Sequence, residues 1–345
     1  MLEISGLEWA VMIGVIVALL ALDLVLAWWK PHRVGFTEAT AWSVFYILVA
    51  VAFGVVFAMM HGWDFGTQYF TGYIVEKSLS VDNLFVFVII MTTFAVPEEH
   101  QHKVLTFGIV LALIMRAIFI GVGVTLLNLF SFMFLLFGLL LLWTAVQLYR
   151  HKDEEPDVED NLVVKGARRL FPVTESYDGG RLFSRENGRR VATPMFIVLV
   201  AIGGIDLLFA LDSIPAVFGV TQEAYIVFAA NAFALLGLRQ LYFLIGGLLE
   251  RLIYLAHGLS VILAFIGVKL TLHALHENNV PFINGGQPVP VPEVPIWLSL
   301  LVITGTIAVA AVASLVVSRR RAAAETTGER DEVAHAPGGD RAGEQ

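Results

Sequence analysis

The sequence contains no cysteine among its 345 residues. This absence excludes disulfide bonds and metal sites built on thiolates. Charged residues are also scarce: they make up 15% of the chain, whereas they make up about 25% of an ordinary soluble domain. A phosphate-binding loop of the form G-x-x-x-x-G-K-[ST] is missing, so the chain does not hydrolyse ATP by a P-loop.

Long apolar runs dominate the sequence instead, and hydrophobic residues make up 57% of it. Segments of about 20 apolar residues, which suffice to cross a bilayer, recur along the chain. The first run lacks the basic region of a signal peptide, so we interpret it as a retained spanning helix. We therefore predict an all-α polytopic membrane protein with nine spans, at residues 8–28, 40–60, 69–95, 104–127, 129–149, 194–220, 224–249, 254–275 and 296–317.

Lysine and arginine fall in alternate connections between these spans. The connections at 61–68 and 276–294 contain none, whereas the connection at 150–193 is rich in them. Basic residues also follow the first, third, seventh and ninth predicted spans. Because basic residues accumulate in cytoplasmic loops, this pattern predicts an N-terminus outside and a C-terminus in the cytoplasm.

The spans and their connections divide the chain into six predicted parts. The large connection contains Asn187-Gly188, which is typical of a hairpin turn. The last residues are rich in Ala, Gly and Glu without apolar periodicity, which favours disorder. The parts are an N-terminal transmembrane hairpin (1–68), a three-helix unit (69–149), a cytoplasmic loop (150–193), a second three-helix unit (194–275), an outer loop with a final helix (276–317) and a disordered tail (318–345).

The two three-helix units repeat one pattern. "EKSLSVDNLFVF" (76–87) aligns with "DLLFALDSIPAV" (206–217): each begins with an acid, has an Asp six residues later and then a small polar residue. The next span of each unit holds one arginine, Arg116 or Arg239, and the third span holds a similar glycine. Because the units begin on opposite sides of the membrane, we predict an inverted-topology repeat, in which substrate sites lie near the midplane. The paired positions are Glu76 and Asp206, Asp82 and Asp212, and Asn83 and Ser213.

Acids within spans need an explanation, because a charged residue at a helix centre costs roughly 2.5–3.5 kcal/mol on insertion scales. A structural explanation is that buried ion pairs lock the bundle, and for Arg116 and Arg239 we favour it. For the acids it is weaker, because buried ion pairs seldom improve on apolar packing. Asp23, alone in the first span, fits either explanation.

Helical periodicity places Glu76 with Asn83 on one stripe, and puts the Asp of each motif about 120° away from the first acid. A local break in the helix would let the first acid of a motif and the Asp six residues later converge. Pro215 predicts such a break in the second motif, since its ring displaces the carbonyl of Leu211.

The groups in the two motifs are oxygen donors, which suit hard divalent ions such as Mn²⁺, Mg²⁺ and Ca²⁺. The residues alone do not choose among these ions. We predict as metal ligands Glu76, Asp82, Asn83, Asp206, Asp212 and Ser213, with Asp23, Arg116 and Arg239 as accessory residues.

Four stretches resemble the TerC family of bacterial integral membrane proteins, named for tellurium resistance: "GYIVEKSLSVDNLFVF", "LFPVTESYDGGRLF", "DLLFALDSIPAVFGVT" and "FAANAFALLGLRQLYFLIGGLL". The resemblance runs from about Leu22 to Thr271. It implies two inverted three-helix units, similar to the lysine-exporter superfamily, in the plasma membrane of a bacterium, and Mn²⁺ efflux, which is attributed to members. Many members have Glu where Gly203 stands here, so the second unit lacks one acid.

Two functions follow as alternatives. The first is secondary export of a divalent cation, with Mn²⁺ as substrate and no permanently bound cofactor. The second is a membrane scaffold in a tellurite or envelope-stress complex that transports nothing. Tellurite itself is disfavoured as a ligand, because an oxyanion prefers arginine, lysine or helix N-termini. We expect a non-enzyme whose partners are the metal ion and the lipid bilayer, with no nucleic acid; the sequence does not identify a protein partner.

Overall fold

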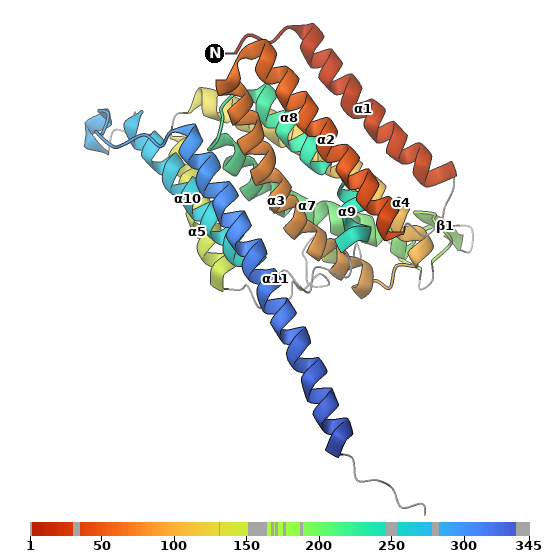
Figure 1. Cartoon of the computed structure of the whole chain (residues 1–345). Helices are drawn as coiled ribbons and strands as arrows, with labels where there is room; N and C mark the ends of the chain where they lie inside the picture. Colours follow the sequence, from red (N-terminus) through yellow and green to blue (C-terminus); the bar gives the residue numbers. More distant parts are fainter. Residues whose placement is uncertain are drawn as a thin grey trace, which may run out of the picture.

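A computed structural model of the chain shows a bundle of long helices with one small β-hairpin (Figure 1). It describes residues 2–29, 35–130, 132–150, 164–166, 169, 172–174, 177–186, 189–245, 254–277 and 283–335. Within these residues, eight helical segments are long and apolar enough to cross a membrane. The prediction of a predominantly helical, multi-pass membrane protein is confirmed.

The elements follow the predicted spans closely. Ala224–Leu244 counts as one of the eight segments although it consists of two helices, α8 and α9. The strands are β1 (Phe183–Glu186) and β2 (Arg189–Ala192), and η2 (Asn284–Gly286) is a short 3-10 turn. The helices are α1 (Gly6–Trp29), α2 (Phe36–His61), α3 (Trp63–Thr93), α4 (Glu98–Leu129), α5 (Met133–Arg150), α7 (Pro194–Phe218), α8 (Ala224–Leu235), α9 (Leu238–Ile245), α10 (Leu255–His276) and α11 (Ile296–His335).

Helix α3, at 31 residues, is long enough to span but is not among the eight. Every span-length stretch of it contains Glu76 and Lys77 together with either Asp64 or Asp82. This helix packs against α2, α7, α8 and α11, so protein surrounds it (Figure 1). The predicted count of nine spans depends on α3 and stays a prediction.

The bundle has two distinct ends. At the N-end, where α1 begins, the Leu2 amide donates a hydrogen bond to the Glu223 carboxylate, 3.1 Å away. At the opposite, loop end, the Tyr177 hydroxyl donates to the Phe94 carbonyl at 2.7 Å. Helix α3 runs from the N-end towards the loop end and α7 runs back, so the two helices that contain the repeated motifs are antiparallel.

The predicted three-helix units pack reciprocally: α3 lies against α8, α4 against α7, and α5 against α10. The closest approach is at the crossing of α5 and α10. A Cβ atom on Gly138 or on Gly267 would lie 2.9 Å from the carbonyl oxygen of the other, so only glycine fits at either position without a shift. The glycine of each repeat therefore serves one shared contact, although the inverted repeat itself stays a prediction.

Two features lie towards the loop end. Strands β1 and β2 pair antiparallel on either side of residues 187–188, as the Asn-Gly turn predicts. Helix α11 continues to His335 and projects beyond the bundle (Figure 1). Residues 318–335 are thus helical where composition favours disorder; their Ala, Glu and Arg residues have high helix propensity, which explains the difference.

Candidate functional site

A buried arginine occupies the centre of the bundle. Arg116, about midway along α4, has a side chain that is 0% exposed. Its guanidinium forms an ion pair with Glu76 of α3, which is equally buried. It also reaches Asp206 of α7, with Nη2 3.1 Å from Oδ1 and Nε 3.4 Å from Oδ2. One arginine therefore joins the two acids that begin the repeated motifs.

Two amides complete the contacts of this cluster. The Asn231 Oδ1 atom of α8 accepts from Arg116 Nη1 at 3.4 Å. With the Asn83 amide turned so that its oxygen faces the guanidinium, Oδ1 accepts from Arg116 Nη2 at 3.1 Å and its nitrogen donates to the Leu79 carbonyl at 3.0 Å. We call Glu76, Asn83, Arg116, Asp206 and Asn231 the central cluster; helices α3, α4, α7 and α8 supply it.

Two buried hydroxyls share helix faces with the acids. Ser80 follows Glu76 by four residues, and Ser213 follows Asp206 by seven, so each lies on the same stripe as its acid. Both are buried, and their Oγ atoms have no hydrogen-bond partner among the described residues. A buried hydroxyl without a partner costs free energy and calls for an explanation such as a bound ion or water.

The predicted ligands thus divide into three groups. Glu76, Asn83 and Asp206 meet at Arg116, and Ser213 lies on the stripe of Asp206. Asp212 is half-buried on α7, where the continuous helix turns it about 120° from Asp206. The side chain of Asp82 lies outside the described residues. The role of each residue as a metal ligand stays a prediction.

Sequence reasoning missed Asn231. It is the one polar side chain within the otherwise apolar or aromatic helix α8, "AYIVFAANAFAL", apart from the hydroxyl of Tyr225. A lone amide at the centre of an apolar run is itself a signal, because such a group needs a partner within the bundle.

The predicted break at Pro215 is wrong. Helix α7 runs without interruption from Pro194 to Phe218, and α3 is also continuous. Pro215 lies within the last turn of α7, where the loss of one backbone hydrogen bond does not end the helix. Asp206 and Asp212, which the break was predicted to bring together, therefore stay about 120° apart. The acids that meet are Glu76 and Asp206, from different helices.

A helix break does occur in the next span of the second unit, between α8 and α9. Gly237 has φ +78°, a conformation that favours glycine. The break exposes backbone carbonyls at the end of α8, and Lys77 of α3 donates to two of them, Ala234 at 2.9 Å and Leu236 at 3.4 Å. An ammonium at a helix C-terminus is favourable because the helix dipole is negative there.

The second repeat arginine forms a separate cluster. Arg239 of α9 lies with Nη2 2.9 Å from the Asp23 carboxylate of α1, and Nη1 donates to the Asp23 backbone carbonyl at 3.0 Å. The same carboxylate accepts from Gln240 Nε2 at 2.6 Å and from the Tyr46 hydroxyl at 3.3 Å. We call Asp23, Tyr46, Arg239 and Gln240 the peripheral cluster. The sequence left open whether Asp23 joins the metal site or pairs with an arginine; in the structure it pairs with Arg239.

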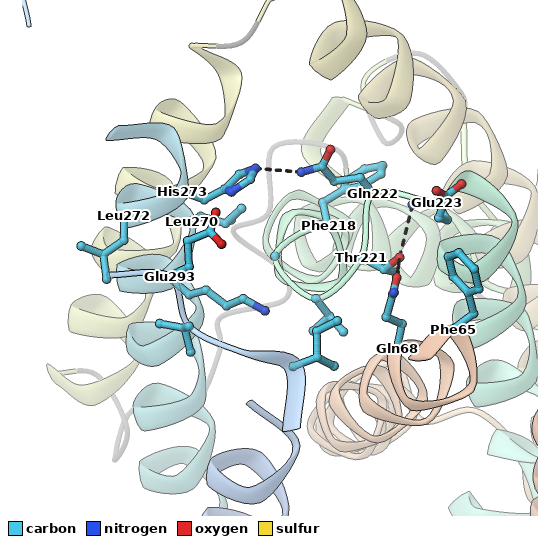
Figure 2. Close-up of a pocket in the computed structure, with 15 residues that line it drawn as sticks. Phe65, Gln68, Phe218, Thr221, Gln222, Glu223, Leu270, Leu272, His273 and Glu293 are labelled. Carbon is cyan, nitrogen blue, oxygen red and sulfur yellow. Dashed lines mark hydrogen bonds between the residues drawn. The ribbon is translucent and has the colours of Figure 1, made fainter. Parts of the chain in front are cut away.

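A cavity of about 380 Å³ opens at the N-end (Figure 2). The first turns of α3, the turn between α7 and α8, α10 and the residues before α11 line it. Polar groups in it are tied in pairs: Thr221 Oγ1 donates to Gln68 Oε1 at 2.5 Å, and Gln222 Nε2 lies 2.8 Å from His273 Nε2. Glu223 and Glu293 also line the cavity.

The described residues contain no group of three or more His, Asp or Glu side chains arranged to hold a metal ion. The central cluster supplies two such side chains, Glu76 and Asp206, and the Arg116 guanidinium lies where they converge. Carboxylate, amide and hydroxyl oxygens are present there, and they are the donor set of hard divalent ions.

Comparison with known proteins gives consistent matches. Residues 61–322 match the family described as "Integral membrane protein TerC family". A protein of Mycobacterium tuberculosis, named only as an uncharacterized membrane protein, is 47% identical over 322 residues, which cover 92% of this chain and 81% of that protein. A membrane protein of Myxococcus xanthus with a similar name is 41% identical over 311 residues, covering 90% and 92%.

A plant protein also matches. The thylakoid membrane protein TERC of Arabidopsis thaliana is 45% identical over 223 residues, which cover 65% of this chain and 58% of that protein. No solved structure matches.

Proposed function

Since this chain belongs to the TerC family of integral membrane proteins, we propose that it is a secondary transporter that exports a divalent cation, with Mn²⁺ as the substrate. Glu76 and Asp206 would bind the ion between the two repeat units, with Asn83 and Ser213 as further oxygen donors. The proposal assigns the chain no chemical reaction and no permanently bound cofactor.

The observation that carries this proposal is the meeting of Glu76 with Asp206. These acids lie at corresponding positions of the two motifs and come from antiparallel helices, yet they contact one guanidinium at the centre of the bundle. Burial of two carboxylates against one cation costs stability. Its presence therefore suggests that the two acids serve a function other than stability. Many transporters bind their substrate at the interface of two repeats near the midplane.

Polar groups also extend from this point in both directions. Along α7, Ser213 follows Asp206 towards the N-end, where the cavity begins at Phe218. Along α3, Ser80 and Asn83 follow Glu76 towards the loop end. Beyond them, apolar residues of α3, α4 and α7 form a packed core that includes Ile90 and Ile202. Towards the N-end, the buried apolar residues Ile214, Val217 and Phe218 separate the central cluster from the cavity. We infer that this conformation is closed towards both ends.

The charge pattern gives the orientation that the proposal assigns to the protein in the membrane. The positive-inside rule assigns the N-end to the outside and the loop end, with β1, β2 and the end of α11, to the cytoplasm. The relatives in Mycobacterium and Myxococcus are bacterial membrane proteins, which supports a place in the bacterial plasma membrane. An ion released into the N-end cavity would then leave the cell.

A scaffold without transport is the competing function, and one observation favours it. Arg116 already pairs with both acids, so the central cluster needs no metal ion to hold the helices together. Under this alternative, the loop at 150–193 and the projecting part of α11 would carry the function, and neutralising the acids would leave the resistance phenotype unchanged.

Metal content of cells decides between the two. We would express wild type, Glu76→Gln, Asp206→Asn and the Asp82→Asn/Asp212→Asn pair in bacteria that lack their own manganese exporter. Export predicts that wild type lowers cell manganese and that the variants match the empty vector at equal membrane expression. Unchanged manganese with wild type present in the membrane would reject export of this ion and favour the scaffold.

A further inference from the structure

The central cluster is not balanced in charge. It contains two carboxylates, Glu76 and Asp206, and one guanidinium, Arg116, all within the buried interior. Their formal charges sum to −1 when both acids are ionised. Asn83 and Asn231 add hydrogen bonds but no charge.

A divalent ion changes this sum in two different ways. If Arg116 stays in place beside the ion, the cluster reaches +1, which is as unbalanced as before. If Arg116 leaves, two carboxylates and one divalent ion sum to zero. Because an uncompensated charge in a low-dielectric interior is costly, electrostatics favours the second arrangement.

The volume between the two carboxylates leads to the same conclusion. The Arg116 guanidinium contacts Glu76 and lies 3.1 Å from the Asp206 carboxylate, so it fills the volume between the two acids. An ion bound to both carboxylates would need oxygens at about 2.0–2.6 Å, in that same volume. Guanidinium and metal ion therefore exclude each other.

We propose that Arg116 is a tethered cation that holds the substrate position in the empty transporter, and that the substrate must displace it. This inference rests on the proposed function. The hydrogen bond to Asn231, at 3.4 Å, points to the side on which the guanidinium stays anchored after displacement. Arg116 is then a specificity-determining residue: a monovalent ion that displaced it would leave the cluster at −1 and gain no balance.

The test is binding of Mn²⁺ to purified full-length protein in detergent. Binding is measured by the thermal unfolding midpoint of the protein and by electron paramagnetic resonance of Mn²⁺. Arg116→Gln should bind Mn²⁺ at least ~10-fold more tightly than wild type, since removal of an internal competitor raises the fraction of binding-competent protein. Its unfolding midpoint should be low without metal and rise more with Mn²⁺ than that of wild type. In cells it should not export, because nothing expels the ion.

The chain offers a matched control in Arg239→Gln, which removes the equivalent arginine from the peripheral cluster. Its unfolding midpoint should fall, and its Mn²⁺ affinity should equal that of wild type. If Arg116→Gln fails to fold with or without Mn²⁺, Arg116→Lys replaces it. Lysine is a point charge that does not bridge two carboxylates as the planar guanidinium does, so it should compete less and bind Mn²⁺ several-fold more tightly than wild type.

The outcomes separate the two proposals. Wild-type export with equal or weaker Mn²⁺ binding by the Arg116 variants overturns the displacement of Arg116 and leaves transport standing. No Mn²⁺ binding by any variant, together with no export by wild type, overturns both. Tighter binding of Na⁺ or K⁺ by Arg116→Gln, equal in size to the gain for Mn²⁺, also overturns the role of Arg116 in selectivity.

Discussion

Two arginines at equivalent places in the two repeats have different surroundings. Arg116 meets two carboxylates, one from each repeat unit, whereas Arg239 meets one carboxylate, Asp23, which belongs to α1 outside the repeats. The peripheral cluster is therefore neutral and the central cluster has an excess negative charge. A buried neutral ion pair can be explained as a link between helices, whereas a buried excess of negative charge is what the proposed binding of a cation requires.

The neighbours of each arginine also bear on this contrast. At the peripheral cluster, one Asp23 oxygen accepts from Tyr46 and Gln240 and pairs with Arg239, so it is saturated. Along the stripes of the central acids, the Ser80 and Ser213 hydroxyls have no partner among the described residues. The peripheral cluster also contains an oxygen without a partner among the described residues, Oε1 of Gln240, so the main difference between the two clusters is their charge.

The largest effect should come from neutralising the central acids one at a time. Glu76→Gln or Asp206→Asn leaves Arg116 with a single carboxylate, so the cluster becomes neutral and the protein should fold. Metal export should fall to the level of empty vector, measured as cell manganese. Asp23→Asn is the matched change in the peripheral cluster, and it should keep export at equal expression. Loss of export in Asp23→Asn alone would reverse the assignment of the two clusters.

A large loss of stability is expected for Arg239→Met. It leaves the Asp23 carboxylate buried without its cation, which costs about 3–5 kcal/mol. The measurement is the free energy of unfolding in detergent with and without Mn²⁺, and the metal should not restore it. The double variant Asp23→Asn/Arg239→Met should lose less than Arg239→Met alone, because no unpaired charge remains. Equal losses in the two variants would argue against a buried ion pair.

An intermediate effect is expected at the break beside Arg239. Gly237→Ala places a side chain at φ +78°, and its Cβ would lie 2.9 Å from Tyr46, a member of the peripheral cluster. The left-handed conformation alone costs roughly 1–2 kcal/mol, and the contact adds to it. Gly14→Ala in α1, where a Cβ meets nothing within 4 Å, is the control and should not destabilise the protein. Thermal unfolding of both variants checks this.

The smallest effect on stability should be that of Ser213→Ala. Because a buried hydroxyl without a partner among the described residues costs free energy, its loss should not lower the free energy of unfolding and should raise it slightly. The Mn²⁺ concentration needed for half-maximal export should rise. Ser43→Ala in α2 removes another buried hydroxyl without such a partner, away from the central cluster. It should affect stability in the same direction and leave the Mn²⁺ concentration for half-maximal export unchanged. An equal rise of this Mn²⁺ concentration in both variants would show that Ser213 is not part of the site.

Sequence periodicity predicted most of the helices and the faces on which the acids lie, because both depend on local spacing. It also predicted that the arginines form buried ion pairs. It did not predict which acid each arginine meets: Arg239 pairs with Asp23, and this depends on how α1 packs. Periodicity defines a face of one helix and contains no information about the neighbouring helix.

The position of the helix break shows the same limit. Pro215 is the stronger local signal, yet α7 continues through it, whereas Gly237 lies in a run that looks like ordinary membrane helix. Glycine is frequent in membrane helices, so its presence did not mark a break. The break is stabilised from a distance, by Lys77 of α3, and only the folded arrangement places that ammonium at the end of α8.

Lys77 has a consequence for motion, because it follows Glu76 directly on α3. Consecutive residues project about 100° apart, so one side chain reaches the Arg116 guanidinium while the next holds the carbonyls of Ala234 and Leu236. A rotation of α3 that withdraws the acid from its guanidinium also draws the ammonium away from the end of α8. The central cluster and the break between α8 and α9 are thus coupled, because one peptide bond joins Glu76 to Lys77.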